Sequence, residues 1–245
     1  MKTKKRPLLF FLYQWFFAFP VLLVITALVA LSTMVLSPLF PNSKLSYYPA
    51  RWWARVFCRL TFVNVKVSGL EKLNPKQSYV FVLNHQSLYD IFAVYGWIPN
   101  IFKWMMKAEL RKIPLVGKAC ESAGHIFIDR INPITAGHSL EKAEAQLRNG
   151  ISVVVFPEGT RTTTGEMSKF KRGAFRIATD LFLPIVPITI RGSYERLNRN
   201  TLKVTPGTIE MIIHDSIDVA PFLPENSAGL IQKTWEEIHS SLLVD

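Results

Sequence analysis

Two patterns of hydrophobic and polar residues divide the chain near residue 63. Before that point, an almost unbroken apolar run extends from Leu8 to about Leu36. After it, short apolar runs alternate with amphipathic stretches. We therefore predict an N-terminal membrane anchor over residues 1–62 and an α/β domain over residues 63–245.

The apolar run is much longer than the ~7–15 residues of a signal-peptide core, and no small-x-small cleavage site closes it. As a straight helix it would measure roughly 43 Å, more than the ~30 Å hydrocarbon core of a bilayer. We expect Pro20 to divide it, and Pro38 with Pro41 to end it. Lys and Arg flank the run on both sides, so a single span would leave one basic flank outside, against the positive-inside tendency. The pattern favours a helical hairpin dipping into the cytoplasmic leaflet (of the inner membrane in a bacterium), with a single span as the alternative.

A second segment, "YYPARWWARVFCRLTF", combines a basic stripe with aromatic residues. Arg51, Arg55 and Arg59 recur every four residues and would share one face of a helix. Three large aromatics lie among them. This pattern is typical of a helix in the plane of the membrane interface, with its cations on lipid phosphates. The alternative is a core helix with one solvated face.

Five apolar runs in the second part predict strands. They cover residues 79–83, 101–106, 125–129, 151–156 and 184–190. Helices are predicted at about 87–97, 134–148, 172–182 and 225–243, and a hairpin around Pro206 and Gly207. Alternating strands and helices indicate a largely parallel central sheet flanked by helices. Ligands of such sheets bind at the carboxyl ends of the strands.

The stretch "FVLNHQSLYD" places His85 directly after a predicted strand, with Asp90 five residues later. Residues five apart do not share a helix face, so a contact requires His85 in the turn and Asp90 in the first helical turn. Ser87 and Asp90 also match a capping box, in which Asp90 only caps a helix and His85 is incidental. Local sequence alone leaves both interpretations open.

Two further segments repeat the arrangement of an apolar strand followed by polar residues. "VVVFPEGTRT" ends a strand with Glu158, Gly159 and Arg161; glycine allows close backbone approach to a ligand, and arginine matches phosphate. "KAELRKIPLVGKACESAGHIFIDR" places Lys107 before a short helix and Arg130 just after a strand. Three strand ends with a His-Asp pair, an acid and several cations predict one site for an anionic substrate. The following "GEMSKFKRGAF" adds cations that fit a solvated basic loop.

The net charge and the cysteine count limit the kinds of binding partner that we expect. The chain carries 29 Lys and Arg against 18 Asp and Glu, a net charge of +11. This suits nucleic acid, an anionic membrane or phosphorylated substrates, and the apolar N-terminus favours the membrane over nucleic acid. Two cysteines provide neither a disulfide framework nor a Cys-rich zinc site, which indicates a reducing, cytosol-facing compartment. The five histidines show no paired ligand spacing and no dinucleotide or P-loop fingerprint is present, so we predict no metal and no cofactor.

Taken together, these residues resemble the membrane-bound glycerophospholipid acyltransferases, specifically the 1-acyl-sn-glycerol-3-phosphate (lysophosphatidate) acyltransferases. The family's N-H-x-S-x-x-D motif, with its His-x4-Asp core, appears as "NHQSLYD". Its second motif is intact from Lys107 to Arg130, its third appears as "FPEGTR" and its fourth as "IVPI". The four motifs occur in order over residues ~80 to ~190, and their combination is highly specific.

The resemblance implies transfer of an acyl chain from acyl-CoA or acyl-carrier protein, as co-substrate, to the sn-2 hydroxyl of lysophosphatidate, giving phosphatidate. His85 would act as general base and Asp90 would orient it. Arg161 would bind the phosphate of the acceptor, with Lys107 and Arg130 as weaker candidates, and Glu158 would position the substrate. The expected partners are lysophosphatidate and other anionic membrane lipids.

Two other functions remain open from sequence. A hydrolase would use His85 to activate water, although "AGHSLE" lacks the last glycine of a nucleophile elbow and fits a helix. A basic lipid-binding protein would explain the charge and anchor but not the acids at strand ends. Within the acyltransferases, another lysophospholipid or glycerol 3-phosphate is the alternative acceptor.

Overall fold

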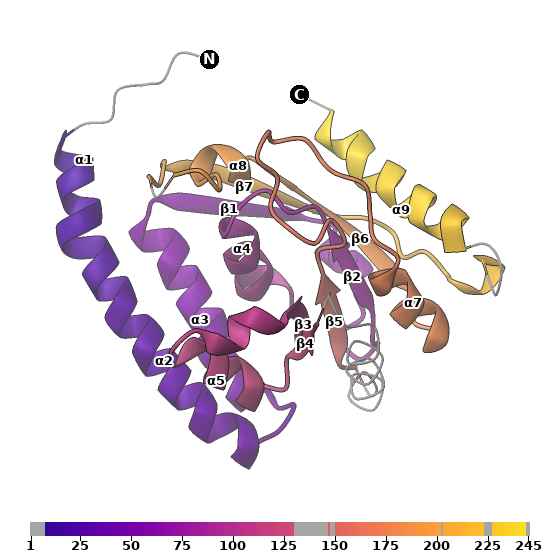
Figure 1. Ribbon diagram of the computed structural model, residues 1–245, viewed down its shortest axis with the longest axis horizontal. Coiled ribbons are helices and arrows are strands. Elements are labelled where there is room, and N and C mark those ends of the chain that lie inside the picture. The colour runs from indigo at the N-terminus through magenta and orange to yellow at the C-terminus, as the bar shows by residue number, and fades with distance from the viewer. Residues whose placement is uncertain (1–7, 130–146, 148–149, 202, 223–226, 244–245) are drawn as a thin grey trace.

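The computed structural model describes residues 8–129, 147, 150–201, 203–222 and 227–243. Its centre is a seven-stranded sheet in the order β1-β7-β6-β2-β5-β3-β4 (Figure 1). Neighbouring strands are parallel except β6 and β7, which are antiparallel. The strands are β1 (Val63–Ser68), β2 (Val80–Leu83), β3 (Phe102–Lys107), β4 (Ile126–Ile128), β5 (Ser152–Val155), β6 (Ile185–Arg191) and β7 (Gly207–Ile213). The predicted α/β class with a largely parallel sheet is confirmed.

The five predicted strands are all present, as β2 to β6. Strand β2 is buried at every position, as is β5. A strand covered on both faces by helices must be apolar on both sides, which is why these strands appear in the sequence as continuous apolar runs.

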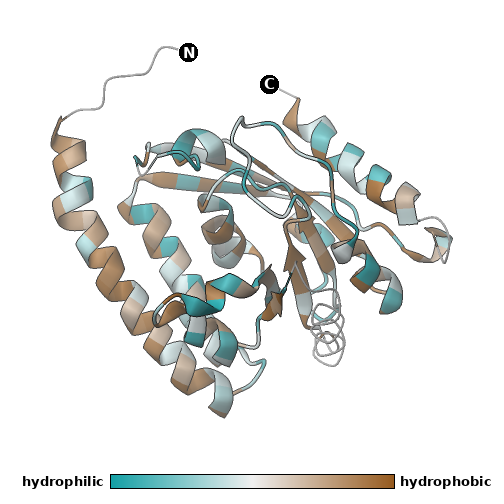
Figure 2. Ribbon diagram, in the orientation of Figure 1, coloured by the Kyte–Doolittle hydropathy of each residue, from teal (hydrophilic) through white to brown (hydrophobic). Residues whose placement is uncertain are grey.

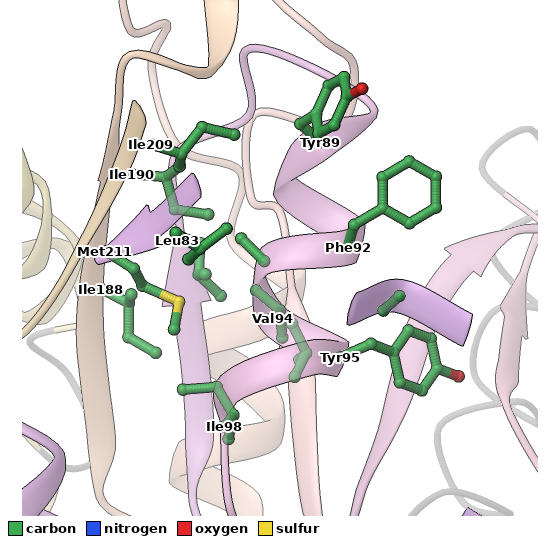
Figure 3. Packing of buried hydrophobic residues seen from close by; sticks show 14 of the residues in the cluster. Leu83, Tyr89, Phe92, Val94, Tyr95, Ile98, Ile188, Ile190, Ile209 and Met211 are labelled. Atoms are coloured by element: carbon green, nitrogen blue, oxygen red, sulfur yellow. The ribbon is translucent and has the colours of Figure 1, made fainter. Parts of the chain in front are cut away.

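Helices cover both faces of the sheet (Figure 1). On one face, α4 packs against β2, β6 and β7, and α3 packs against α4. Figure 3 shows this cluster: Leu83, Ile190 and Met211 lie between the strands and α4, and the rings of Phe92 and Tyr95 extend from the opposite side of α4. On the other face lie α7 and α9. The covering helices are α3 (Lys44–Leu60), α4 (Tyr89–Trp97), α7 (Gly173–Asp180) and α9 (Ser227–Leu242).

Short elements complete the described chain. They are η2 (Leu70–Lys72), η3 (Ala108–Lys112), α5 (Val116–Ser122), α8 (Ser193–Arg196) and η4 (Ala220–Phe222). The predicted helix at 134–148 falls almost entirely outside the described residues.

The N-terminal apolar run forms one long helix from α1 (Leu8–Tyr13) through η1 (Gln14–Ala18) to α2 (Phe19–Leu39). By length and composition, this helix could cross a membrane. Pro20 does not divide it, contrary to our expectation, because the ring sits in the first turn of α2 directly after the wider π-helical turn η1. The chain instead reverses after Leu39, near Pro41, and α2 packs along α3 as a helical hairpin.

The ribbon of α1 and α2 is largely brown in Figure 2, which marks these helices as apolar, and many of their apolar side chains are exposed. Among them are Leu9, Phe16, Leu23, Leu28, Val35 and Leu39. The inner face of the long helix packs toward α3 and α5.

Helix α3 contributes Ala54 and Cys58 to the core, and two of the three arginines that we predicted at the membrane interface bind the end of α4 instead. Arg51 and Arg55 each donate a hydrogen bond from Nε to the carbonyl of Gly96, at 3.2 and 2.8 Å. Cations are favourable there because the carboxyl end of α4 carries partial negative charge. Phe57 stacks on Phe92, with ring centroids 3.9 Å apart. The predicted boundary at residue 62 falls between α3 and β1, yet α3 contributes to the same core as the sheet.

The hairpin predicted around Pro206 and Gly207 is also wrong. The described residues before Pro206 form no strand; the N–H of Thr205 donates to the carbonyl of Arg196 instead. Strand β7 pairs with β6 and with β1, a strand that we did not predict. A turn-like Thr-Pro-Gly sequence gives no information on such long-range pairing, and the long-range pairs decided the topology.

Candidate active site

Three of the predicted motifs meet at the carboxyl edge of the sheet because their strands are neighbours. Strand β5 lies between β2 and β3. The residues after β2, β5 and β3 are therefore brought together: His85, the turn from Phe156 to Arg161, and Lys107 at the end of β3 itself. Arg130 lies outside the described residues.

His85 and Asp90 are in direct contact. Nδ1 of His85 lies 2.8 Å from Oδ2 of Asp90, whose side chain is completely buried. Within the described residues, no group hydrogen-bonds to Nε2 of His85. The carboxylate therefore holds Nδ1 and leaves Nε2 for another partner.

Asp90 also binds the backbone at the start of α4, so the same carboxylate makes the capping contacts and the contact with His85. Its Oδ2 accepts the backbone N–H groups of Gln86 and Ser87, at 2.7 and 2.8 Å. Ser87 Oγ accepts the N–H of Tyr89 at 3.2 Å. The cap fixes the carboxylate in the first turn of the helix, and the same oxygen fixes the imidazole.

The imidazole plane is held by stacking. His85 lies on the Phe156 ring with centroids 3.8 Å apart and 10° between planes, and Phe156 stacks in turn on Trp104. Sequence reasoning included Phe156 in a motif but assigned it no role.

Glu158 joins the two principal loops. Its Oε1 accepts the backbone N–H of His85 at 2.6 Å, and its Oε2 accepts the N–H of Ser168 at 2.8 Å. The N–H of Thr162 donates back to the His85 carbonyl at 3.0 Å. Burial raises the pKa of Glu158 to about 7, although the two backbone N–H groups oppose that rise. Glu158 therefore fixes the backbone of His85, a role that we did not predict; the predicted role was positioning of the substrate.

A cavity of about 780 Å³ opens beside His85 and extends to α2 and α3. Most of its wall is apolar, and the wall comes largely from α2, α3, β3, η3 and α5. Residues of this wall include Val29, Ala30, Tyr47, Trp53, Met106, Leu110 and Val116. One face of α2 therefore lines the cavity while the other is exposed, so the cavity and the apolar outer surface are separated by a single helix.

Cations gather at the His85 end of this cavity. Lys107, Arg161 and Arg199 all line it, as do Gly159 and Thr160. Burial lowers the pKa of Arg161, and the nearby positive charge of Arg199 lowers it further. Two cations close enough to disfavour each other's charge form a favourable place for an anion.

Sequence reasoning missed Arg199. It follows α8, beyond the fourth motif, and its Nη1 donates to Thr160 Oγ1 at 3.1 Å. No local pattern marks it, because only the pairing of β6 with β2 brings this segment to the His85 edge.

The other described histidines have different partners. His214 Nδ1 lies 3.2 Å from Glu237 Oε1, and His239 stacks on Trp235. His125 also lines the cavity, but its Nδ1 accepts the N–H of Trp104 and its Nε2 contacts the Tyr95 hydroxyl. Burial lowers the pKa of His125 to about 3, which makes it a weak base near neutral pH. Among the residues that the structure describes, no group of three or more metal-ligating side chains is found.

Comparison with known proteins identifies the family to which the chain belongs. Residues 64–191, which include His85, Asp90, Glu158 and Arg161, match the model of a family described as Acyltransferase. The chain is 37% identical to 1-acyl-sn-glycerol-3-phosphate acyltransferase of Cocos nucifera over 59% of this chain and 47% of that protein. It is 33% identical to 1-acyl-sn-glycerol-3-phosphate acyltransferase alpha of Homo sapiens over 74% of this chain and 64% of that protein. The chain thus spans about half to two-thirds of the length of these relatives.

A solved structure is similar over nearly the whole length. The crystal structure of the 1-acyl-sn-glycerophosphate (LPA) acyltransferase PlsC from Thermotoga maritima superposes with a TM-score of 0.78 at 27% identity, covering 96% of this chain and 93% of that one. The sheet, its strand-end site and this likeness define the class as α/β proteins of the acyltransferase fold. Within that class, the chain belongs to the Acyltransferase family.

Proposed function

We propose that this protein transfers an acyl chain from a thioester, acyl-CoA or acyl-carrier protein, to the sn-2 hydroxyl of lysophosphatidate and so forms phosphatidate. The contact between His85 Nδ1 and Asp90 Oδ2 carries the proposal. An alcohol is a poor nucleophile near neutral pH, so a base must take its proton as it attacks. His85 offers Nε2 for this purpose at the wall of the cavity.

The reaction uses the substrate hydroxyl in place of an enzyme nucleophile. The hydroxyl oxygen attacks the thioester carbonyl while Nε2 of His85 takes the proton. Asp90 stabilises the imidazolium that forms, as the acid does in a serine-hydrolase triad. The tetrahedral intermediate then collapses, the C–S bond breaks, and the thiolate takes the proton back from His85. No covalent acyl-enzyme is required.

The oxyanion of the intermediate needs N–H donors. The N–H groups of Gln86 and Ser87 already bind Asp90, which removes the start of α4 as a source. The N–H of Gly159 likewise donates to the Phe156 carbonyl, so we assign this task to the N–H groups of Thr160 and Arg161, which line the cavity.

Arg161 and Arg199 bind the phosphate of lysophosphatidate in this proposal, and Lys107 assists from the end of β3. Arginine presents a planar set of donors that matches phosphate oxygens. A dianionic group between Arg161 and Arg199 would also remove the repulsion that lowers the Arg161 pKa.

The apolar part of the cavity receives an acyl chain. It lies behind α2, whose outer face is exposed and apolar. With α1 and α2 in the cytoplasmic leaflet, a lipid reaches His85 without passing through water. The named activities of the relatives from Cocos nucifera, Homo sapiens and Thermotoga maritima support this substrate class. We assign no role in nucleic-acid binding to the excess positive charge.

The test supplies a labelled acyl thioester and a panel of acceptors to the full-length wild type and to His85→Ala in lipid vesicles. We expect phosphatidate from lysophosphatidate with wild type, and a loss of at least ~100-fold in turnover for the variant with its thermal midpoint retained. Free fatty acid that forms at the same rate with and without acceptor would identify a hydrolase instead.

A further inference from the structure

Three cations stand on the outside of the loop that follows the Glu158 turn. Lys169, Lys171 and Arg172 are all exposed, and none of their side chains forms an ion pair or hydrogen bond with another described residue. Phe170, between them, packs inward against Phe175. The inward aromatic side chain anchors the segment and the cations around it face solvent.

This basic segment, residues 169–172, is tied to the candidate active site through its backbone. The N–H of Lys171 donates to the Pro157 carbonyl at 3.0 Å, and the N–H of Ser168 donates to Glu158 Oε2 at 2.8 Å. The other oxygen of Glu158 holds the N–H of His85. A partner bound at the basic segment is therefore held in a fixed relation to His85.

The basic segment lies away from the apolar N-terminal surface. It leads into α7, which covers the face of the sheet opposite to α3 and α4 (Figure 1). The exposed apolar residues of α1 and α2 are on the α3 side. With α1 and α2 at the membrane, the segment faces water, which favours a soluble anionic partner over lipid headgroups.

The form of the segment favours a protein over a nucleotide. A nucleotide needs a concave pocket for its base. None of the three cations lines the 780 Å³ cavity. Exposed cations on a surface loop outside the cavity instead match the surface carboxylates of an acidic protein.

We propose that Lys169, Lys171 and Arg172 form the docking surface for an acyl-carrier protein, which supplies the thioester. This inference rests on the proposed function and chooses the donor. The carrier is acidic, and its acyl chain is attached to a long flexible arm. Docking at the basic segment leaves the arm free to reach the strand ends where His85 lies.

The test compares wild type with the triple variant Lys169→Ala/Lys171→Ala/Arg172→Ala in vesicles, with acyl-carrier protein and acyl-CoA as alternative donors. We expect KM for the acyl-carrier protein to rise at least ~10-fold with weaker salt dependence, and KM for acyl-CoA to change less than ~2-fold. The matched control, Lys66→Ala/Lys76→Ala/Lys203→Ala, removes three exposed lysines elsewhere and should leave both values unchanged. Binding of a fluorescent carrier protein, measured without turnover, should weaken in parallel with the KM effect.

Other results overturn the proposal. Equal losses with both donors would assign the segment to maintaining the Glu158 loop, and a loss with acyl-CoA alone would indicate a nucleotide site. Weaker binding to anionic vesicles with unchanged carrier binding would identify a lipid surface. Carrier binding that depends on the segment, without phosphatidate from wild type and either donor, would keep the docking surface and refute the proposed function.

Discussion

The backbone N–H of His85 donates to Oε1 of Glu158 at 2.6 Å, which joins the residue proposed as base to an acid 73 positions later in the chain. The acid is buried and its other oxygen is held by Ser168. Ionised Glu158 thus positions the loop of His85 at a cost in desolvation. This cost makes the stability of the protein depend on pH.

We predict that the free energy of unfolding falls as pH rises from about 5 to about 8. Burial raises the pKa of Glu158 from 4.5 to about 7, so between these values the folded state binds more protons than the unfolded state. Glu158→Gln cannot ionise and should lose this part of the slope. The measurement is the thermal midpoint in detergent at several pH values, with Glu166→Gln, an exposed acid in the same loop, as control. Parallel profiles for wild type and Glu158→Gln would contradict the assignment.

Asp90→Asn should lower turnover by about 10²–10⁴-fold, because an amide cannot stabilise the imidazolium. The substitution also weakens the cap of α4, in which Gln86 and Ser87 donate to the same oxygen. Ser87→Ala provides the control, since it removes a capping hydroxyl but leaves the acid. Steady-state kinetics and thermal midpoints of both variants separate the two tasks. The proposed catalytic role of the His85–Asp90 pair is refuted if Asp90→Asn loses only as much activity as Ser87→Ala.

Arg199→Ala and Arg161→Ala should each raise KM for lysophosphatidate more than they lower kcat. Both guanidinium groups line the His85 end of the cavity, and neither is placed at the reacting carbonyl. Each charge-assisted contact to phosphate contributes roughly 1.5–3 kcal/mol, which corresponds to about 10–150-fold in KM. Arg176→Ala, an exposed cation paired with Asp180, is the control. An unchanged preference for phosphate-bearing over phosphate-free acceptors in both arginine variants would exclude this phosphate site.

Gly159→Ala should destabilise the turn that carries Thr160 and Arg161. Gly159 has φ of +79°, a conformation that costs a residue with a Cβ about 1–2 kcal/mol. Gly173→Ala is matched, because that glycine begins α7, has no positive φ and faces open space. We expect a lower thermal midpoint and lower turnover for Gly159→Ala, and an equal or higher midpoint for Gly173→Ala. Equal midpoints for the two variants would show that the turn does not require glycine.

Filling the cavity from α2 should change the choice of acyl chain. Ala30 lines the cavity and is nearly buried, so Ala30→Phe should reduce turnover of long acyl chains more than that of short ones. Leu28→Phe changes an exposed position on the same helix and should leave the preference unchanged. The measurement is a series of acyl thioesters of increasing length. A uniform loss across the series would show that the acyl chain lies elsewhere.

Much of the fold could be predicted because the central strands are buried on both faces. Complete burial requires apolar side chains on both sides of β2 and β5, so each appears as a short apolar run. Strand β1 alternates apolar and polar residues over only six positions, and its pairing partner β7 lies far away in the chain. The pairing, rather than local propensity, made residues 207–213 a strand without a hairpin.

The sequence by itself determined the α/β class, the positions of His85 and Glu158 after strands and the position of Asp90 in the first turn of a helix, because burial and turn chemistry act over a few residues. Only the tertiary structure decided that Asp90 both caps α4 and holds the imidazole, that Glu158 holds the His85 backbone, and that Arg199 joins Arg161. It also decided that Arg51 and Arg55 bind the end of α4 rather than face outward. These contacts join segments that are distant in the chain, and the packing of strands and helices alone brings such segments within hydrogen-bonding distance.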